Sequence, residues 1–313
     1  MAILVTGCAG FIGSHLTEKL LLSGEQVVGI DMLTPYYPVE RKRKNLEILR
    51  KHQSFRFVEG NLNQMDIASL LNNITVIYHL AGQPGVRLSW GKDFDEYVDH
   101  NIRATQRLLE AVKNISLQKL VYASSSSVYG NVDRDILTET DVPTPFSPYG
   151  VTKLAGEHLV NSYRANFGVP VTSLRFFTVF GPRQRPDMAF QRVVEALING
   201  NEFVVYGDGT QVRDFTYVED IVNGCIAAAN RGRAGEVYNL GGTNLASLND
   251  ALNLLQEIAG KKLNIKYIEK QSGDVSKTRA NISKAQSDLQ YQPHISLAEG
   301  LKRQFLYQSS LTK

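Results

Sequence analysis

Two side chains that could move a proton, Tyr149 and Lys153, lie four positions apart and follow directly after Ser147-Pro148. Proline is favoured in the first turn of a helix, and residues four apart share one helix face. Free tyrosine has a pKa near ~10, and a neighbouring ammonium favours its phenolate. The pair therefore predicts a general base that takes the proton of a hydroxyl while hydride leaves the carbon. The alternative, which an isolated match would favour, is a surface tyrosine beside a solvated lysine.

Serines 124–127 stand upstream of this pair, directly after the apolar run Leu120–Ala123. A serine hydroxyl at that place can hydrogen-bond a substrate oxygen and shuttle its proton. Serines at a strand end, in this order relative to Tyr149 and Lys153, favour the catalytic interpretation of the pair.

A glycine-rich string, Thr6-Gly7-Cys8-Ala9-Gly10-Phe11-Ile12-Gly13, follows the first apolar run and begins the first amphipathic segment. Glycines three apart allow a tight turn, close approach of backbone N–H groups to a pyrophosphate, and close packing of helix on strand. The string lies inside a βαβ unit from Ala2 to Asp31, which strengthens an otherwise weak signal. It predicts a dinucleotide site with contributions from Gly7, Gly10, Phe11, Ile12 and Gly13.

Asp31 ends the second expected strand, where a carboxylate would accept hydrogen bonds from both hydroxyls of an adenosine ribose. The same charge would repel a 2′-phosphate, and Met32 and Leu33 supply no compensating cation. The sequence therefore predicts NAD, not NADP, as the cofactor. Taken alone, Asp31 could instead be a capping residue at a strand end.

Short apolar runs alternate with amphipathic segments through the first half of the chain. The expected strands are Ala2–Val5, Gln26–Asp31, Phe55–Glu59, Val76–Leu80, Leu120–Ala123 and Val171–Phe176. The expected helices are Ile12–Leu22, Gln64–Leu71, Tyr97–Lys113 and Tyr149–Phe167. Strands buried on both faces and joined by helices predict an α/β fold with a Rossmann-type, doubly wound parallel sheet.

The pattern changes after about residue 177, where turns such as 206–211 and 239–244 separate shorter elements. Two helices are expected late in the chain, at Leu248–Ile258 and Leu297–Leu306. We expect residues 1–177 to form the NAD-binding domain, with returning segments near 212–242. Residues 178–313 should form a smaller α/β substrate domain that is interleaved with the first.

Composition bounds the class of protein. The 313 residues carry a formal net charge of +3, which gives no argument for nucleic acid as a partner. Two cysteines, without a CxxC pair or a histidine cluster, predict no metal site and favour a reducing, cytoplasmic compartment. No apolar run approaches the ~20 residues of a membrane span. The basic run 41–44 reads as a solvated helix face, with an anion-binding patch as the alternative.

The spacing GxxGxxG, followed by Asp31 and YxxxK, resembles the short-chain dehydrogenase/reductase superfamily. In that superfamily Asn61-Leu62 would contact adenine, and Leu80-Ala81-Gly82 would lie along the cofactor. Many relatives carry Asp at the Asn61 position, but an amide can still pair with the adenine amino group. The family places its catalytic hydroxyl four residues before the tyrosine of a VYG tripeptide, which here selects Ser125, with Ser126 as a second polar contact.

The whole chain resembles the extended branch of this superfamily, the NAD-dependent sugar-nucleotide epimerases and dehydratases. The dehydratases carry an Asp-Glu pair immediately before VYG, and decarboxylases of UDP-glucuronate carry a Glu at the position of Ser127. Here the two positions are Ser126 and Ser127, which cannot act as carboxyl acid and base. Oxidation and re-reduction of one hydroxyl carbon, which is epimerisation, remains.

The segment 176–189, with Arg185-Pro186-Asp187-Met188-Ala189 at its end, is similar to that of UDP-glucuronate 4-epimerases. Neutral-sugar 4-epimerases carry Asn at the Thr178 position and lack this ending. A guanidinium at Arg185 could hold the sugar carboxylate at two points, with hydroxyls from Thr178 and Ser126. The clasp would also keep the carboxylate of a β-keto acid out of the alignment that loses carbon dioxide. The alternative is a solvated loop arginine balanced by Asp187.

Further substrate contacts follow from the same resemblance: Ser126, Ser127 and Met188 at the sugar, Arg213 on a phosphate, and Asp274 at the uridine ribose. The alternative for Arg213 is a salt bridge with Asp214 at the start of a helix. Arg87, beyond the fourth strand, could face the substrate or form a structural salt bridge. Family members commonly form a homodimer through the helices expected at Tyr97–Lys113 and Tyr149–Phe167.

The sequence thus predicts C4 epimerisation of a UDP-hexuronate, UDP-glucuronate to UDP-galacturonate, through a transient 4-keto intermediate. The nearest rivals are a 4-epimerase of UDP-glucose or UDP-N-acetylglucosamine and a UDP-glucuronate decarboxylase. Others are an oxidoreductase that releases NADH and a catalytically silent dinucleotide sensor. A sensor would need none of Ser125, Tyr149 and Lys153.

Overall fold

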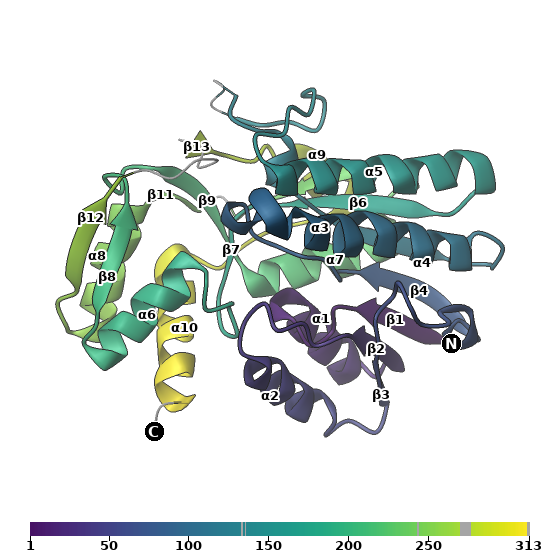
Figure 1. Cartoon of the computed structure of the whole chain (residues 1–313), viewed down its shortest axis with the longest axis horizontal. Helices are drawn as coiled ribbons and strands as arrows, with labels where there is room; N and C mark the ends of the chain where they lie inside the picture. Colours follow the sequence, from purple (N-terminus) through teal and green to yellow (C-terminus); the bar gives the residue numbers. More distant parts are fainter. Residues whose placement is uncertain (133, 135, 243, 270–276, 312–313) are drawn as a thin grey trace.

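Seven parallel strands form the central sheet, in the order β3-β2-β1-β4-β5-β6-β10 (Figure 1). The computed structural model describes residues 1–313 except 133, 135, 243, 270–276 and 312–313. The strands are β1 (Ala2–Thr6), β2 (Val27–Asp31), β3 (Phe55–Glu59), β4 (Ile74–His79), β5 (Lys119–Ser125), β6 (Val171–Phe176) and β10 (Val237–Leu240). The six strands expected from the sequence are confirmed, and so is the Rossmann-type α/β fold, whose order reverses between β1 and β4.

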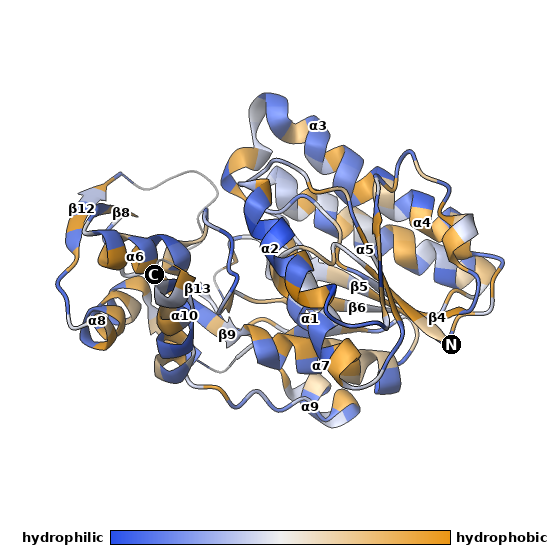
Figure 2. Cartoon of the chain, turned by 90° about the horizontal axis from the view of Figure 1, so that it is seen from below, coloured by the Kyte–Doolittle hydropathy of each residue, from blue (hydrophilic) through white to orange (hydrophobic). Residues whose placement is uncertain are grey.

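Both faces of this sheet are buried because helices cover each of them. Successive side chains of a strand point to opposite faces. Accordingly, Ile3 and Val5 of β1 pack in one hydrophobic cluster with α1 (Phe11–Leu22) and α7 (Val218–Arg231). Leu4 packs in another cluster with α4 (Ala104–Val112) and α5 (Pro148–Phe167). Figure 2 shows the apolar colouring of the central strands between these two layers of helices.

A smaller group of elements lies beside the sheet, at the left of Figure 1. It contains the parallel pair β8 (Glu202–Tyr206) and β12 (Asn264–Ile268), and the helices α6 (Ala189–Asn199), α8 (Leu248–Ala259) and α10 (Leu297–Leu311). The strands β7 (Val179–Phe180), β11 (Asn244–Ser247) and β13 (Lys277–Thr278) pair with β9 (Val212–Tyr217). The cluster that contains Val5 also contains Phe190 and Leu252, so one core runs through both groups.

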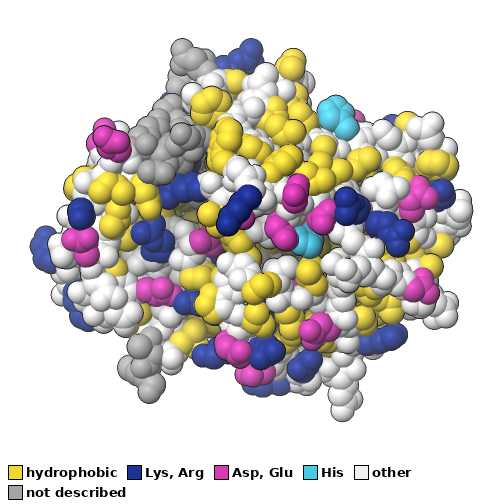
Figure 3. All heavy atoms as spheres, viewed as in Figure 1, with side chains coloured by type: hydrophobic (Ala, Val, Ile, Leu, Met, Phe, Trp, Pro, Cys, Tyr) yellow, Lys and Arg dark blue, Asp and Glu magenta, His cyan; other side chains and the backbone are white. Residues whose placement is uncertain are grey.

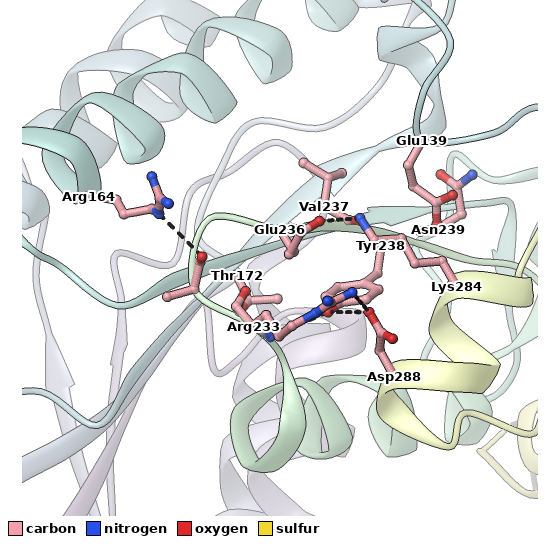
Figure 4. Close-up of polar contacts among 11 residues, drawn as sticks. Glu139, Arg164, Thr172, Arg233, Glu236, Val237, Tyr238, Asn239, Lys284 and Asp288 are labelled. Atoms are coloured by element: carbon pink, nitrogen blue, oxygen red, sulfur yellow. Dashed lines mark hydrogen bonds and ion pairs between the residues drawn. The ribbon is translucent and has the colours of Figure 1, made fainter.

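The chain returns to the large sheet through α7 and the edge strand β10. Beside β10 lies α9 (Ser283–Leu289), and ion pairs drawn in Figure 4 attach this helix to the residues just before the strand. Lys284 pairs with Glu236 at 2.5 Å and donates to the Val237 carbonyl at 2.8 Å, and Arg233 pairs with Asp288. Side chains thereby occupy part of a strand edge that would otherwise offer unpaired backbone groups.

Two expectations about helices need correction. The helix expected at Gln64–Leu71 is wrong, because only a 3-10 turn, η1 (Ala68–Leu70), forms there. The segment Tyr97–Lys113 is helical but not uniform. A π-helical segment, η4 (Val98–Arg103), separates α3 (Phe94–Tyr97) from α4.

The basic run 41–44 is not simply a solvated face of its helix, α2 (Val39–Leu49). Lys42 is buried, and its ammonium donates to Thr34 Oγ1 at 2.8 Å and to the Thr34 carbonyl at 3.1 Å. Composition could not show this, because the direction of each side chain on a helix depends on what packs against it. In the part of the chain that is described, no helix has the length and apolar character needed to cross a bilayer.

Candidate active site

A cavity of about 430 Å³ lies along the carboxyl ends of the sheet strands. Its lining joins the glycine-rich loop, the ends of β2, β4 and β5, the start of α5, and the segment that follows β6. Ligands of open α/β sheets bind at this edge, where the strand order reverses. The residues predicted for the cofactor all line it: Gly7, Gly10, Phe11, Ile12, Gly13, Asp31, Asn61, Leu62, Leu80, Ala81, Gly82, Tyr149 and Lys153.

The glycine-rich loop has the shape of a cradle for a pyrophosphate. Gly7 has φ +74°, a conformation that side chains disfavour. A Cβ on Gly13 would lie 2.0 Å from the Gly7 carbonyl oxygen, so the helix packs on the turn at a distance that glycine alone permits. The loop leads directly into α1. The backbone of this turn and the N-terminal end of α1 therefore line the cavity where the pyrophosphate of a dinucleotide would bind.

The Asp31 carboxylate is held in place by backbone donors at the end of β2. Oδ2 accepts from the Ala9 N–H at 3.1 Å, and Oδ1 accepts from the Leu33 N–H at 2.8 Å. Lys42 Nζ lies 4.0 Å from Oδ1. The sequence argument from Met32 and Leu33 missed this cation. The Lys42 ammonium lies near the Asp31 carboxylate, which would accept hydrogen bonds from the ribose hydroxyls.

Lys153 is buried at the inner wall of the cavity. Its ammonium donates to the Ala123 carbonyl at 2.9 Å, at the end of β5. Burial lowers the pKa of Lys153 to about 8, and Glu157, one helical turn further along α5, opposes that shift. The same carbonyl fixes the lysine beside the strand that carries the serines.

Tyr149 begins the same helix, whose N-cap Ser147 accepts from the Gly150 N–H at 3.2 Å. Burial raises the pKa of Tyr149, while a hydrogen bond with Ser125 and the charge of Arg185 lower it. Sequence reasoning named Lys153 as the neighbour that favours the phenolate. The structure adds Ser125 and Arg185 as contributors, because both side chains reach the same cavity.

The serines continue from β5 into a short 3-10 turn, η5 (Ser126–Val128). Ser125 Oγ accepts from the Ser127 N–H at 3.1 Å and donates to Ser127 Oγ at 3.2 Å. Ser125, Ser126 and Ser127 all line the cavity. Among the described residues that line it, Asp31 is the sole carboxylic acid.

Arg185 enters the cavity from the turn after β7, and Thr178 and Met188 line the same side. Its guanidinium forms a two-point ion pair with Asp187, at 3.0 Å from Nε and 2.9 Å from Nη2. Its side chain is 18% exposed. The pairing with Asp187 matches the alternative raised from the sequence, but the low exposure does not fit a solvated loop charge.

Two predicted substrate contacts lie outside the described lining. The Arg87 guanidinium lies over the ring of Tyr206, 4.2 Å from its centroid, and so joins the loop after β4 to β8. Arg213 lies within strand β9, where Nη1 donates to the Val212 carbonyl at 2.9 Å. The alternative of a helix start at Asp214 is wrong, since Asp214 is buried in the same strand and accepts from the Gly242 N–H at 2.9 Å. Asp274 lies outside the described residues.

Several lining residues were missed by sequence reasoning, among them Tyr36, Tyr37, Gln83 and His100. The Tyr36 hydroxyl donates to Asp187 Oδ2 at 3.5 Å, so Tyr36 reaches across the cavity to the turn that carries Arg185. The signal available was Tyr36-Tyr37-Pro38, aromatic residues in the loop directly after Asp31. Across the described ranges no group of three or more His, Cys, Asp or Glu side chains could hold a metal ion.

Comparisons with known proteins agree with this geometry. The sequence model of the NAD dependent epimerase/dehydratase family matches residues 3–241. The UDP-glucuronate 4-epimerase of Thermodesulfobacterium geofontis is 39% identical over 304 residues, which cover 96% of this chain and 94% of the relative. An uncharacterized UDP-glucose epimerase of Bacillus subtilis is 47% identical over 313 residues, 99% of each chain. The crystal structure of UDP-glucuronic acid 4-epimerase from Bacillus cereus, in complex with UDP-glucuronic acid and NAD, superposes with a TM-score of 0.97 at 46% identity, covering 99% of this chain and 100% of that one.

Proposed function

The chain belongs to the NAD-dependent epimerase/dehydratase family, and on that premise we propose that it interconverts UDP-glucuronate and UDP-galacturonate by inverting C4. One observation carries the choice: the cavity that contains Tyr149 and the glycine-rich loop also receives the Arg185 guanidinium. The similarity to the Bacillus cereus enzyme in complex with UDP-glucuronic acid and NAD supports it.

NAD, when bound, accepts a hydride from C4 and later returns it. For that step Tyr149 takes the C4 hydroxyl proton, and Ser125 donates a hydrogen bond to the same oxygen. Two electrons leave with the hydride, so C4 becomes a ketone. When hydride returns to the opposite face, Tyr149 gives its proton back to the oxygen, and the inverted alcohol forms without net oxidation.

Arg185 has two duties in this scheme. Its planar fork binds the C5 carboxylate, a pairing stronger than a neutral hydrogen bond. It also holds the carboxylate away from the alignment with the ketone in which carbon dioxide is lost. Asp187 orients the guanidinium before the sugar arrives, and Tyr36 donates a hydrogen bond to Asp187. We place the UDP moiety on the elements after residue 178 that lie outside the central sheet.

The serines separate this function from other reactions of the family. Removing water from a sugar needs a carboxyl acid and base beside the tyrosine, but hydroxyls stand at Ser126 and Ser127. The carboxyl group among the described lining residues, Asp31, lies at the end of β2. Among the residues that the structure describes, the cavity therefore has the groups for a reversible oxidation and lacks the carboxyl pair for elimination.

The test is incubation of the purified protein with UDP-glucuronate, without added reductant, followed by NMR of the anomeric and H4 signals. We expect a mixture with UDP-galacturonate, with no steady rise in absorbance at 340 nm. UDP-glucuronate that stays unchanged, or is converted to a UDP-pentose with release of carbon dioxide, would contradict the proposal.

A second candidate is 4-epimerisation of UDP-glucose, which the printed name of the Bacillus subtilis relative favours. The two candidates assign different roles to Arg185, because a neutral hexose has no carboxylate for its guanidinium to bind. Parallel incubation with UDP-glucose and UDP-glucuronate at equal concentration separates them. Faster turnover of the neutral sugar would favour the second candidate.

We also propose that the protein forms a homodimer through α4 and α5. Val151, Ala155 and Leu159 are spaced four apart on α5 and are exposed or half-buried, with Val151 50% exposed. Figure 3 shows apolar side chains gathered over the region of α3 and α5. Sedimentation velocity should give a dimer that Val151→Glu dissociates and Lys302→Glu, on α10, does not. A monomeric native protein would contradict this.

A further inference from the structure

Glu157 and Arg175 form an ion pair directly behind the reacting side chains. Glu157 follows Lys153 by one turn of α5, and Arg175 belongs to the strand β6. The guanidinium donates to both carboxylate oxygens, from Nε to Oε1 at 2.9 Å and from Nη2 to Oε2 at 2.7 Å. Their side chains are only 5% and 4% exposed. Desolvation offsets much of the attraction in such a buried pair, so stability alone gives little reason for it.

The pair is connected to the catalytic strand. Ser124 Oγ donates to Glu157 Oε1 at 2.5 Å, at the end of β5. On one side of Ser124 is Ala123, whose carbonyl receives the Lys153 ammonium at 2.9 Å. On the other side is Ser125, which hydrogen-bonds Tyr149. Glu157 therefore holds the side chain of Ser124, which stands between the residue that receives Lys153 and the residue that reaches Tyr149.

Three titratable groups near this pair are neutral at physiological pH. On β4, burial lowers the pKa of His79 to about 3. On β5, burial raises the pKa of Tyr122, and after η5 burial raises that of Tyr129 to about 12. Arg185, on the far wall, is charged but paired with Asp187. A further anion, Glu139, acts on Tyr129, over whose ring the Arg175 guanidinium lies at 4.7 Å from the centroid. The cluster behind Tyr149 itself consists of two cations, Lys153 and Arg175, and one anion, Glu157.

We propose that Arg175 is a positioning residue that neutralises Glu157, so that the charge of Lys153 acts on Tyr149 and is not cancelled by the carboxylate behind it. This inference rests on the proposed use of Tyr149 as the base. With Glu157 paired, the group carries one net positive charge next to the phenol. Without Arg175 that net charge would be zero, although Lys153 itself would be unchanged.

The direction of each effect does not depend on which residue loses the proton. Because Tyr149 and Lys153 lie one turn apart on α5 and line the same cavity, we assign the first proton released to the pair, whose apparent pKa then describes both groups. Any added negative charge nearby makes release harder, and any added positive charge makes it easier. Removing Arg175 should therefore raise the apparent pKa of the pair, and removing Glu157 should lower it.

The experiment measures kcat/KM against pH for the wild type, Arg175→Met, Glu157→Gln, the double variant and Arg175→Lys. We expect the acid limb of Arg175→Met to move up by roughly one pH unit, and that of Glu157→Gln to move down. The double variant restores the net charge and should return to the wild-type limb. Arg175→Lys keeps the charge and should leave the limb in place.

If Arg175 had a merely structural role, its substitution would lower activity without shifting the acid limb of the pH profile. Unmoved limbs in both single variants overturn the inference, and so does a double variant that keeps the shift of Arg175→Met. If Arg175→Met does not fold, Glu157→Gln decides alone, and an unmoved limb then overturns it. All profiles are measured with whichever UDP-sugar the wild type turns over. If UDP-glucuronate is not a substrate, the wild-type protein shows it. That result is distinct from a failure of the Arg175 proposal, which only the variants test.

Discussion

The cofactor side of the cavity comes largely from short, continuous stretches of chain, whereas the sugar side is assembled from distant segments. Residues 6–13 form the glycine-rich loop within one βαβ unit, with Asp31 at its end. The opposite side combines residues from β5, α5 and the turn after β7. The first side works through backbone geometry and the second through side-chain charge. Substitutions should therefore affect the two sides in different ways.

The largest effect is expected at Tyr149, where the two sides meet. Tyr149→Phe removes the hydroxyl that exchanges the proton and keeps the ring, so turnover should fall by roughly 10²- to 10⁴-fold. Stopped-flow measurement of NADH formation, together with NAD affinity by calorimetry, checks this. We expect lost turnover with unchanged NAD binding. Near-normal turnover would refute Tyr149 as the base.

A methyl group on Gly13 should damage the cofactor side selectively. The Cβ of Gly13→Ala would lie 2.0 Å from the Gly7 carbonyl oxygen, so the backbone must shift. Overpacking of this kind costs about 1–3 kcal/mol of stability. A loop that relaxes out of its binding shape to avoid the clash should lose NAD affinity by a similar free energy, roughly 5- to 150-fold. The control is Gly24→Ala, whose Cβ would meet nothing within 4 Å. It should lower stability slightly through its φ of +86° and leave NAD affinity unchanged. Equal effects of both variants on NAD affinity would contradict the comparison.

Arg185→Ala should damage the sugar side selectively. Loss of a charged hydrogen-bonding partner should raise KM for UDP-glucuronate roughly tenfold or more, and part of the product should appear as UDP-pentose. NAD affinity should not change. Arg43→Ala is the matched control, because Arg43 is exposed and pairs only locally with Glu40 among the described contacts. Unchanged KM and product ratio in Arg185→Ala would exclude the clasp.

The smallest effect concerns stability and the buried Lys153. Its folded-state pKa of about 8 lies below the model-peptide value of 10.5, so between these values the unfolded chain binds more protons. Unfolding free energy therefore rises with pH in that window. Between pH 7.5 and 9.5 this contribution is about 2 kcal/mol. The difference between wild type and Lys153→Met in urea unfolding measures it. A difference that is constant with pH would show that the lysine is solvated.

Local patterns predicted six of the seven strands of the large sheet and the cofactor-facing part of the cavity lining, but not the helices α6, α7 and α9. The glycine-rich loop lies within one turn, and Tyr149 and Lys153 lie on one helix. In both cases the local backbone geometry alone determines how the residues are arranged. The apolar spacing at Gln64–Leu71 correctly indicated burial of Ile67 and Leu71, but only a 3-10 turn forms there. Lys42 was misjudged because tertiary packing buries one member of a basic run.

By itself, the sequence determined the parallel α/β architecture, the dinucleotide loop, and the presence of a tyrosine, a lysine and serines in workable order. These features depend on the spacing of residues that are close in the chain, and covalent geometry fixes the relative positions of such residues. Only the tertiary structure decided that Asp187 pairs with Arg185 and accepts from Tyr36, that Arg213 belongs to β9, and that Arg175 faces Glu157. Each of those contacts joins segments or fixes side-chain directions that depend on packing. The physical reason is that charge and hydrogen bonding act through space, over distances that the order of residues does not record.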